Sequence, residues 1–295
     1  MGQTGRLRHI TVGDTKLALL EEPPRAEPGS PPVGTALFVP GLTGSKEDAG
    51  PALAALAARG YRTLSVDLPG QYQSDGPLDP DRYDTNWLGE MVRRVGDRLR
   101  GESDGPLHVI GHSFGGLVCR AAVIDRPSSF ASLTLLCSGP GPIEGDRGKR
   151  ATLLPILVAE LGLSVTDPDG AGMSLLYELN LKAKAAADEA TEILTETETA
   201  LERERFTSTS LASLLGMARA LMAEPDRTAE LAATRLPCFV CCGEADNGWP
   251  IEQQRAMAAA LGTTLVTIAG AAHSPCLEQP AATTAQLLRL WQELR

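Results

Sequence analysis

Short apolar runs alternate with amphipathic segments along most of the chain. Runs rich in β-branched and aliphatic residues predict strands, and apolar residues spaced three and four apart predict helices. The predicted strands are 16–21, 35–39, 61–68, 107–111, 132–137, 238–242 and 264–268. The predicted helices are 47–59, 87–100, 114–125, 251–261 and 282–294. Because each strand can then be buried between crossover helices, we expect an α/β fold with a mostly parallel, doubly wound sheet.

The alternation breaks between the predicted strands at 132–137 and 238–242. The stretch from about residue 139 to 235 is rich in Ala, Leu and Glu and contains several helical patterns in succession. We therefore expect one core domain built from residues 1–140 and 236–295, with a helical subdomain of residues 141–235 inserted into it. A length of 295 residues also favours one large core with an insertion over two full domains.

The amino-acid composition limits the partners, location and cofactors that we expect for this protein. The chain has 27 Lys and Arg against 37 Asp and Glu, and its basic residues form no long run, so we expect no nucleic-acid binding. The sequence has neither a signal-peptide pattern nor an apolar run long enough to span a membrane, which favours a cytoplasmic protein. The six cysteines lie mainly in apolar segments and are expected to be core residues, with no metal or cofactor bound.

The segment Gly111-His112-Ser113-Phe114-Gly115 fits the pattern G-x-S-x-G and lies between a predicted strand and a predicted helix. Such a turn is so tight that small residues must flank it, and it presents the serine oxygen at a helix N-terminus. A chance match is the alternative in a chain with 30 glycines. The strand before and the helix after favour Ser113 as a nucleophile.

A serine hydroxyl needs a neighbouring base, and histidine has the appropriate pKa. Of the four histidines, His9 precedes the first clear predicted strand, His108 lies inside the strand before the turn, and His112 is part of the turn. His273 follows the last predicted strand. Because the carboxyl ends of parallel strands meet at one edge, His273 can reach Ser113. A solvated loop histidine is the alternative.

The base in turn needs a carboxylate that orients its ring. Asp246 lies just beyond the predicted strand 238–242, and the order Ser, Asp, His along the chain then matches the hydrolase pattern. Glu244 is the rival on position alone. The oxyanion donors are expected to be the N–H groups of Phe114 and of Leu42, which follows the predicted strand 35–39. The alternative for that loop is a plain glycine-rich turn.

These motifs together resemble the α/β-hydrolase fold superfamily over nearly the whole chain. The segments that carry the resemblance are 39–48, 67–74, 111–116 and 270–274. The resemblance implies that the insertion corresponds to a helical cap between the sixth and seventh strands. A serine nucleophile argues against the epoxide hydrolases and haloalkane dehalogenases of the superfamily, which use a carboxylate.

We therefore expect a serine hydrolase that cleaves a carboxylic ester or thioester of a small, largely apolar substrate through an acyl-enzyme. The excess of acidic residues between Glu178 and Glu204 favours a neutral substrate. A carbon-carbon bond hydrolase or an acyltransferase with the same three residues remains an alternative. An alternative of another class is a non-catalytic module that binds a small ligand.

Overall fold

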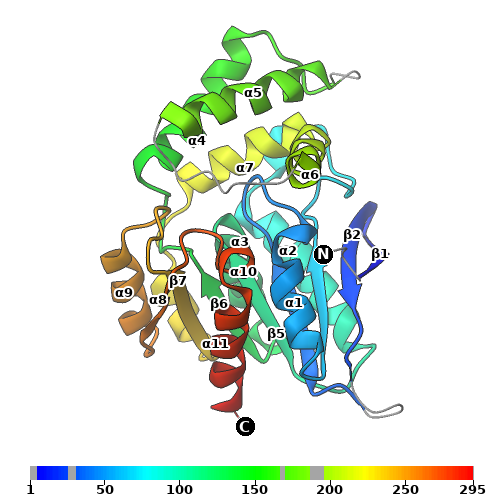
Figure 1. Ribbon diagram of the computed structural model, residues 1–295, viewed down its shortest axis with the longest axis vertical. Coiled ribbons are helices and arrows are strands. Elements are labelled where there is room, and N and C mark those ends of the chain that lie inside the picture. The colour runs from blue at the N-terminus through cyan, green and yellow to red at the C-terminus, as the bar shows by residue number, and fades with distance from the viewer. Residues whose placement is uncertain (1–4, 26–30, 167–169, 187–195, 295) are drawn as a thin grey trace.

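A computed structural model describes residues 5–25, 31–166, 170–186 and 196–294. Within these residues, eight strands form one sheet in the order β1-β2-β4-β3-β5-β6-β7-β8 (Figure 1). Its strands are β1 (Arg6–Val12), β2 (Thr15–Glu22), β3 (Gly34–Val39), β4 (Tyr61–Val66), β5 (Leu107–His112), β6 (Ser132–Leu136), β7 (Cys238–Gly243) and β8 (Leu265–Ile268). Strand β2 pairs antiparallel with β1 and β4, and the remaining neighbours pair parallel. The expected mostly parallel α/β fold is confirmed.

Helices cover both faces of this sheet, and the alternation of side chains along β3 explains why. Leu37 and Val39 join a core with α2 (Thr85–Arg100) and α3 (Phe114–Asp125). The intervening Ala36 and Phe38 join a second core on the other face, with α1 (Gly50–Ala57) and α11 (Pro280–Gln292). Successive strand residues point to opposite faces, so an apolar run without alternation is buried on both sides.

Among the described residues, five helices lie between β6 and β7, and we call this part of the chain the insertion. They are α4 (Gly145–Glu160), α5 (Ala171–Ala186), α6 (Glu196–Thr207), α7 (Leu211–Ala223) and α8 (Thr228–Ala233). In Figure 1, α4 and α5 lie at the top and α7 lies between them and the end of the sheet. Residues 187–195 of the acidic stretch lie outside the described residues. The division into a core of 1–140 and 236–295 and a subdomain of 141–235 stays a prediction.

Two local features differ from the prediction. Residues Arg6–Val12 form the edge strand β1, which includes His9 and pairs with β2 across a turn at Gly13. The predicted helix 47–59 begins as a 3-10 turn, Lys46–Ala49, and continues as α1. All six cysteines are buried and free of disulfides. None of the described helices is both long and apolar enough to cross a bilayer.

The remaining core helices follow the last two strands. Helix α9 (Ile251–Ala260) packs against β7, and the short α10 (Pro275–Glu278) leads into α11. The loop between β7 and α9 carries Asp246, and the loop between β8 and α10 carries His273. Both loops leave the carboxyl end of a strand, so the topology brings them to the edge of the sheet where Ser113 follows β5.

Candidate active site

Ser113 occupies a sharp turn between β5 and α3, with φ 54° and ψ −123°. The turn explains the glycines of the motif. A Cβ atom on Gly111 would lie 2.5 Å from the carbonyl oxygen of Gly115. A Cβ atom on Gly115 would overlap the carbonyl oxygens of Val39, the last residue of β3, and of Pro40, which follows it. Backbone packing therefore requires glycine at both positions.

Ser113, His273 and Asp246 lie in one hydrogen-bonded chain. Ser113 Oγ is 3.1 Å from His273 Nε2, and His273 Nδ1 is 2.5 Å from Asp246 Oδ1. A carboxylate only accepts, so Nδ1 carries the proton and Nε2 presents its lone pair to the serine hydroxyl. Ser113 and His273 are 6% and 7% exposed, so the contact is shielded from bulk water. The arrangement suits removal of a proton from the serine.

The Asp246 carboxylate is held by further donors. The Gly248 N–H donates to Oδ1 at 3.0 Å, and Gln254 Nε2 donates to Oδ2 at 2.8 Å. Burial raises the pKa of Asp246, but the hydrogen bonds from His273, Gly248 and Gln254 outweigh it, and the pKa lies below its usual value. Gln254 was missed by the sequence analysis, because a glutamine on α9 belongs to no motif.

Glu244, the rival carboxylate, has a different position. Its side chain is exposed, and Oε2 accepts from the Gly270 N–H at 3.2 Å. Glu244 therefore contacts the backbone of the loop that carries His273, whereas Asp246 contacts the imidazole itself. Of the two carboxylates, the structure brings Asp246 to the ring.

His112 has a role that the sequence analysis did not assign. Its Nε2 lies 2.6 Å from the carbonyl oxygen of His273. Burial lowers the pKa of His112 to about 3, so the ring is neutral at ordinary pH. A carbonyl oxygen only accepts, so His112 Nε2 carries the proton and donates it, which fixes the backbone at His273. In the sequence, only the position of His112 next to Ser113 points to this contact.

The loop of residues 40–44 packs directly against the nucleophile. A Cβ atom on Gly41 would lie 3.2 Å from Ser113 Cβ and 3.6 Å from Ser113 Oγ. Leu42 follows in this loop, and Phe114 opens α3, where the first N–H groups of a helix have no partner within it. The two backbone donors expected from the sequence therefore belong to segments that adjoin Ser113. Their action on an oxyanion stays a prediction.

The side chains of His112, Cys137 and His273 bring possible metal-ligating atoms within 4.8 Å of one another. Their chemistry does not suit a metal. Burial raises the pKa of the Cys137 thiol well above its usual value, which disfavours the thiolate that binds metals. Both ring nitrogens of His273 already face Asp246 and Ser113.

The chain is similar to proteins of a known family. The profile described as "Alpha/beta hydrolase family" matches residues 36–287. Among curated proteins, the chain is 33% identical over 100 residues to "Putative carbamate hydrolase RutD" of Variovorax paradoxus (strain S110), which covers 34% of this chain and 36% of RutD. It is 27% identical over 219 residues to "Polyketide synthase ThaQ" of Burkholderia thailandensis, which covers 73% of this chain and 10% of ThaQ. These matches span about a third of one relative and a tenth of the other.

Solved structures extend the similarity to nearly the full chain. One is a crystal structure from work on carboxylesterases of Nitrososphaera gargenis, with a TM-score of 0.75 and 17% sequence identity. The match covers 97% of this chain and 98% of that one. At this identity, the likeness shows a shared fold.

Proposed function

Because the chain belongs to the alpha/beta hydrolase family, we propose that it is a serine hydrolase that cleaves a carboxylic ester or thioester of a small, largely apolar substrate. The observation that carries the proposal is the hydrogen-bonded chain from Ser113 through His273 to Asp246. A base on one side of the hydroxyl and a carboxylate behind the base form the constellation that activates a serine for acyl transfer.

In the proposed reaction, His273 Nε2 removes the proton from Ser113 as Oγ attacks the substrate carbonyl carbon. The N–H groups of Leu42 and Phe114 stabilise the resulting oxyanion. His273 then protonates the leaving alcohol or thiol, and an acyl-enzyme on Ser113 remains. A water molecule gives up a proton to His273 and attacks the acyl carbon, and the acid leaves as His273 returns this proton to Ser113 Oγ. Asp246 stays ionised and holds the Nδ1 proton throughout.

The surroundings of Leu42 support an apolar substrate. Leu42 packs against the main core cluster and also against an apolar cluster inside the insertion. That second cluster includes Val158, Met173, Leu176, Phe206, Leu211 and Leu214. We propose that the insertion acts as a cap over Ser113, so that an acyl group bound there would be surrounded mainly by aliphatic and aromatic side chains.

Hydrolysis of p-nitrophenyl acetate and butyrate tests the proposal. We expect a burst of p-nitrophenol equal to the enzyme concentration, followed by slower turnover, and no burst with Ser113→Ala. Ser128→Ala is the matched control, because Ser128 is exposed and precedes β6, at the opposite edge of the parallel sheet. Undiminished turnover by Ser113→Ala would reject the proposal.

The alternatives need separate measurements. Covalent labelling of Ser113 by a fluorophosphonate distinguishes an activated serine from a non-catalytic binding module, because an unactivated hydroxyl does not react. Product analysis with an added alcohol or amine acceptor distinguishes hydrolysis from acyl transfer. Esters and thioesters of graded chain length, together with a carbon-carbon substrate, define the bond cleaved and the acyl group preferred.

A further inference from the structure

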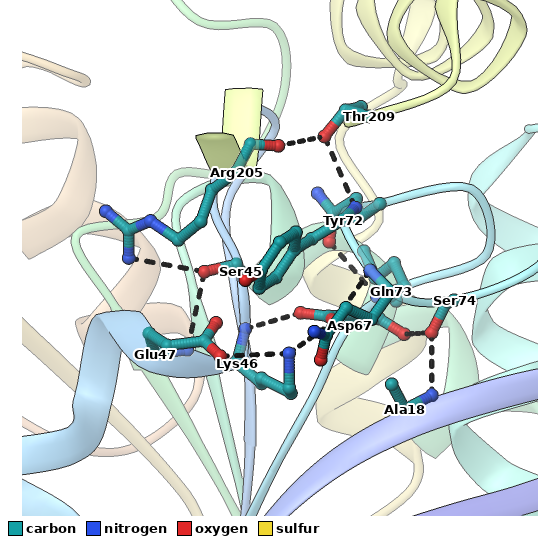
Figure 2. Close-up of polar contacts among 12 residues, drawn as sticks. Ala18, Ser45, Lys46, Glu47, Asp67, Tyr72, Gln73, Ser74, Arg205 and Thr209 are labelled. Atoms are coloured by element: carbon teal, nitrogen blue, oxygen red, sulfur yellow. Dashed lines mark hydrogen bonds and ion pairs between the residues drawn. The ribbon is translucent and has the colours of Figure 1, made fainter. Parts of the chain in front are cut away.

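The loop of residues 67–74 connects the insertion with the neighbourhood of the nucleophile. On one side, Thr209 Oγ1 accepts from the Tyr72 N–H at 3.3 Å. On the other side, Asp67 forms a fully buried ion pair with Lys46 at 2.9 Å. Figure 2 shows both contacts, with Thr209 at the top and Lys46 and Asp67 below. The 67–74 loop is therefore held at both ends.

Gln71 lies in the middle of this loop and is completely buried. Its Nε2 donates to the carbonyl oxygens of Gly41 and Leu42, at 2.8 Å and 3.1 Å. Its Oε1 accepts from the Leu68 N–H at 3.1 Å. The partners fix the orientation of the amide, because carbonyl oxygens accept only from the nitrogen end and an N–H donates only to the oxygen end.

Gln71 controls the direction of two peptide groups beside the nucleophile. The Gly41 carbonyl and the Leu42 N–H belong to one planar trans peptide, in which they point in opposite directions. A donor that holds the carbonyl on one side therefore turns the N–H to the other side. In the same way, the Leu42 carbonyl and the Thr43 N–H belong to one peptide group and point in opposite directions. Since Gly41 packs against Ser113, the orientation of this peptide decides whether its N–H can face a reacting carbonyl.

The backbone around Gln71 is held as firmly as its side chain. The Gln71 N–H donates to the Leu68 carbonyl at 2.9 Å, and its carbonyl accepts from Ser74 N–H at 2.8 Å. Tyr72 has φ 38°, in the left-handed region that side chains with a Cβ atom disfavour. Such a conformation persists only where the surrounding contacts impose it.

We infer that Gln71 is a positioning residue, which aims the Leu42 N–H at the oxyanion by holding the carbonyls of Gly41 and Leu42. The inference rests on the proposed function, and it assigns to a buried glutamine a part in transition-state stabilisation. Gln71 does not touch the substrate in this account. It acts through the 40–44 loop, and the contact of Tyr72 with Thr209 links it to the insertion.

The test compares Gln71→Met with the matched control Gln73→Met, which changes an exposed glutamine of the same loop. An alkyl boronic acid forms a tetrahedral adduct with Ser113 that places an oxygen where the oxyanion develops. We expect Gln71→Met to weaken boronic acid binding and to lower kcat by about 10- to 100-fold, while KM changes by less than about threefold. Gln73→Met should match the wild type in all three measurements.

A second variant, Gln71→Glu, keeps the volume of the side chain but replaces the amide donor with a carboxylate. At a pH above the pKa of the new carboxyl group, it should show the same losses in boronic acid affinity and kcat. It replaces Gln71→Met in the test if that variant does not fold. Boronic acid affinity within twofold of the wild type in either folded variant would overturn the inference. A rise in KM equal to the rise in the dissociation constant for the boronic acid would also overturn it, because that pattern indicates a structural role. A wild-type protein that binds no boronic acid at Ser113 would instead reject the proposed function.

Discussion

The backbone strain at Ser113 leads to an unusual stability prediction. Its φ of 54° and ψ of −123° lie in a region that glycine adopts without a steric penalty. For a residue with a Cβ atom, such a conformation costs about 1–3 kcal/mol. The surrounding backbone enforces it, since the Ser113 N–H donates to Leu136 O at 2.9 Å and the Ser113 carbonyl accepts from Gly116 N–H at 2.9 Å.

Ser113→Ala and Ser113→Gly isolate this strain, because both lose the hydroxyl and its contact with His273. An ordinary buried Ala-to-Gly change costs about 0.5–1 kcal/mol of backbone entropy, and the lost methyl group costs about 0.8 kcal/mol more. At position 113 the relief of strain offsets these costs. We therefore expect the stability of Ser113→Gly to lie between about 1 kcal/mol below and about 2 kcal/mol above that of Ser113→Ala, so that glycine is about 1–3 kcal/mol more favourable here than at an unstrained position, with neither variant active.

Urea unfolding followed by circular dichroism measures the difference. Ala122→Gly is the control, because Ala122 is fully buried and lies within the regular helix α3. It should lose about 1–2 kcal/mol relative to the wild type. If Gly costs as much relative to Ala at position 113 as it does at position 122, the turn stores no strain and the reasoning is refuted.

Three further predictions concern other parts of the molecule. Asp246→Asn should lower kcat for p-nitrophenyl butyrate by about 10⁴-fold, because an amide stabilises the wrong tautomer of His273; a loss below about tenfold would contradict that role. Arg120 and Glu224 form a buried ion pair at 2.7 Å, so Arg120→Met should cost about 3–5 kcal/mol in urea unfolding, and adding Glu224→Gln should restore part of it. Burial raises the pKa of Asp67 from 3.8 to about 6, so the folded state binds the proton more tightly. The unfolding free energy of the wild type should therefore fall relative to Asp67→Asn by roughly 2 kcal/mol between pH 4 and pH 7, and a constant difference across that range would contradict the shift.

The order of strands and helices could be predicted from the chain because each element has its own periodicity. Helix α3 begins and ends at the predicted residues, Phe114 and Asp125. Strand β1 was missed because it lies at the edge of the sheet, where only Ile10 and Val12 of its seven residues are buried. So few buried positions leave almost no alternation to detect.

The turn at Ser113 is also a local property, since a tight strand-to-helix turn requires glycine at particular neighbouring positions. The contact between Ser113 and His273 is different in kind, because it joins residues 160 positions apart. Chain order and the rule for parallel sheets predicted that they would share an edge. The choice between Glu244 and Asp246 as the partner of the imidazole could not be made that way, because the two are separated by one residue in the same loop.

The buried polar partners could not be predicted from the chain. Gln71 contacts Gly41 across 30 residues, and Arg120 contacts Glu224 across 104. Gln71 lies in the segment 67–74 that carries the family resemblance, but the segment does not indicate which groups its side chain meets, and no motif marks Arg120 or Glu224. A glutamine or an arginine in an amphipathic sequence is usually exposed. Periodicity and turn chemistry depend on neighbours along the chain and can therefore be predicted from the sequence. Which donor meets which carbonyl in the interior depends on how separate elements pack, and packing becomes defined only when the whole chain has folded.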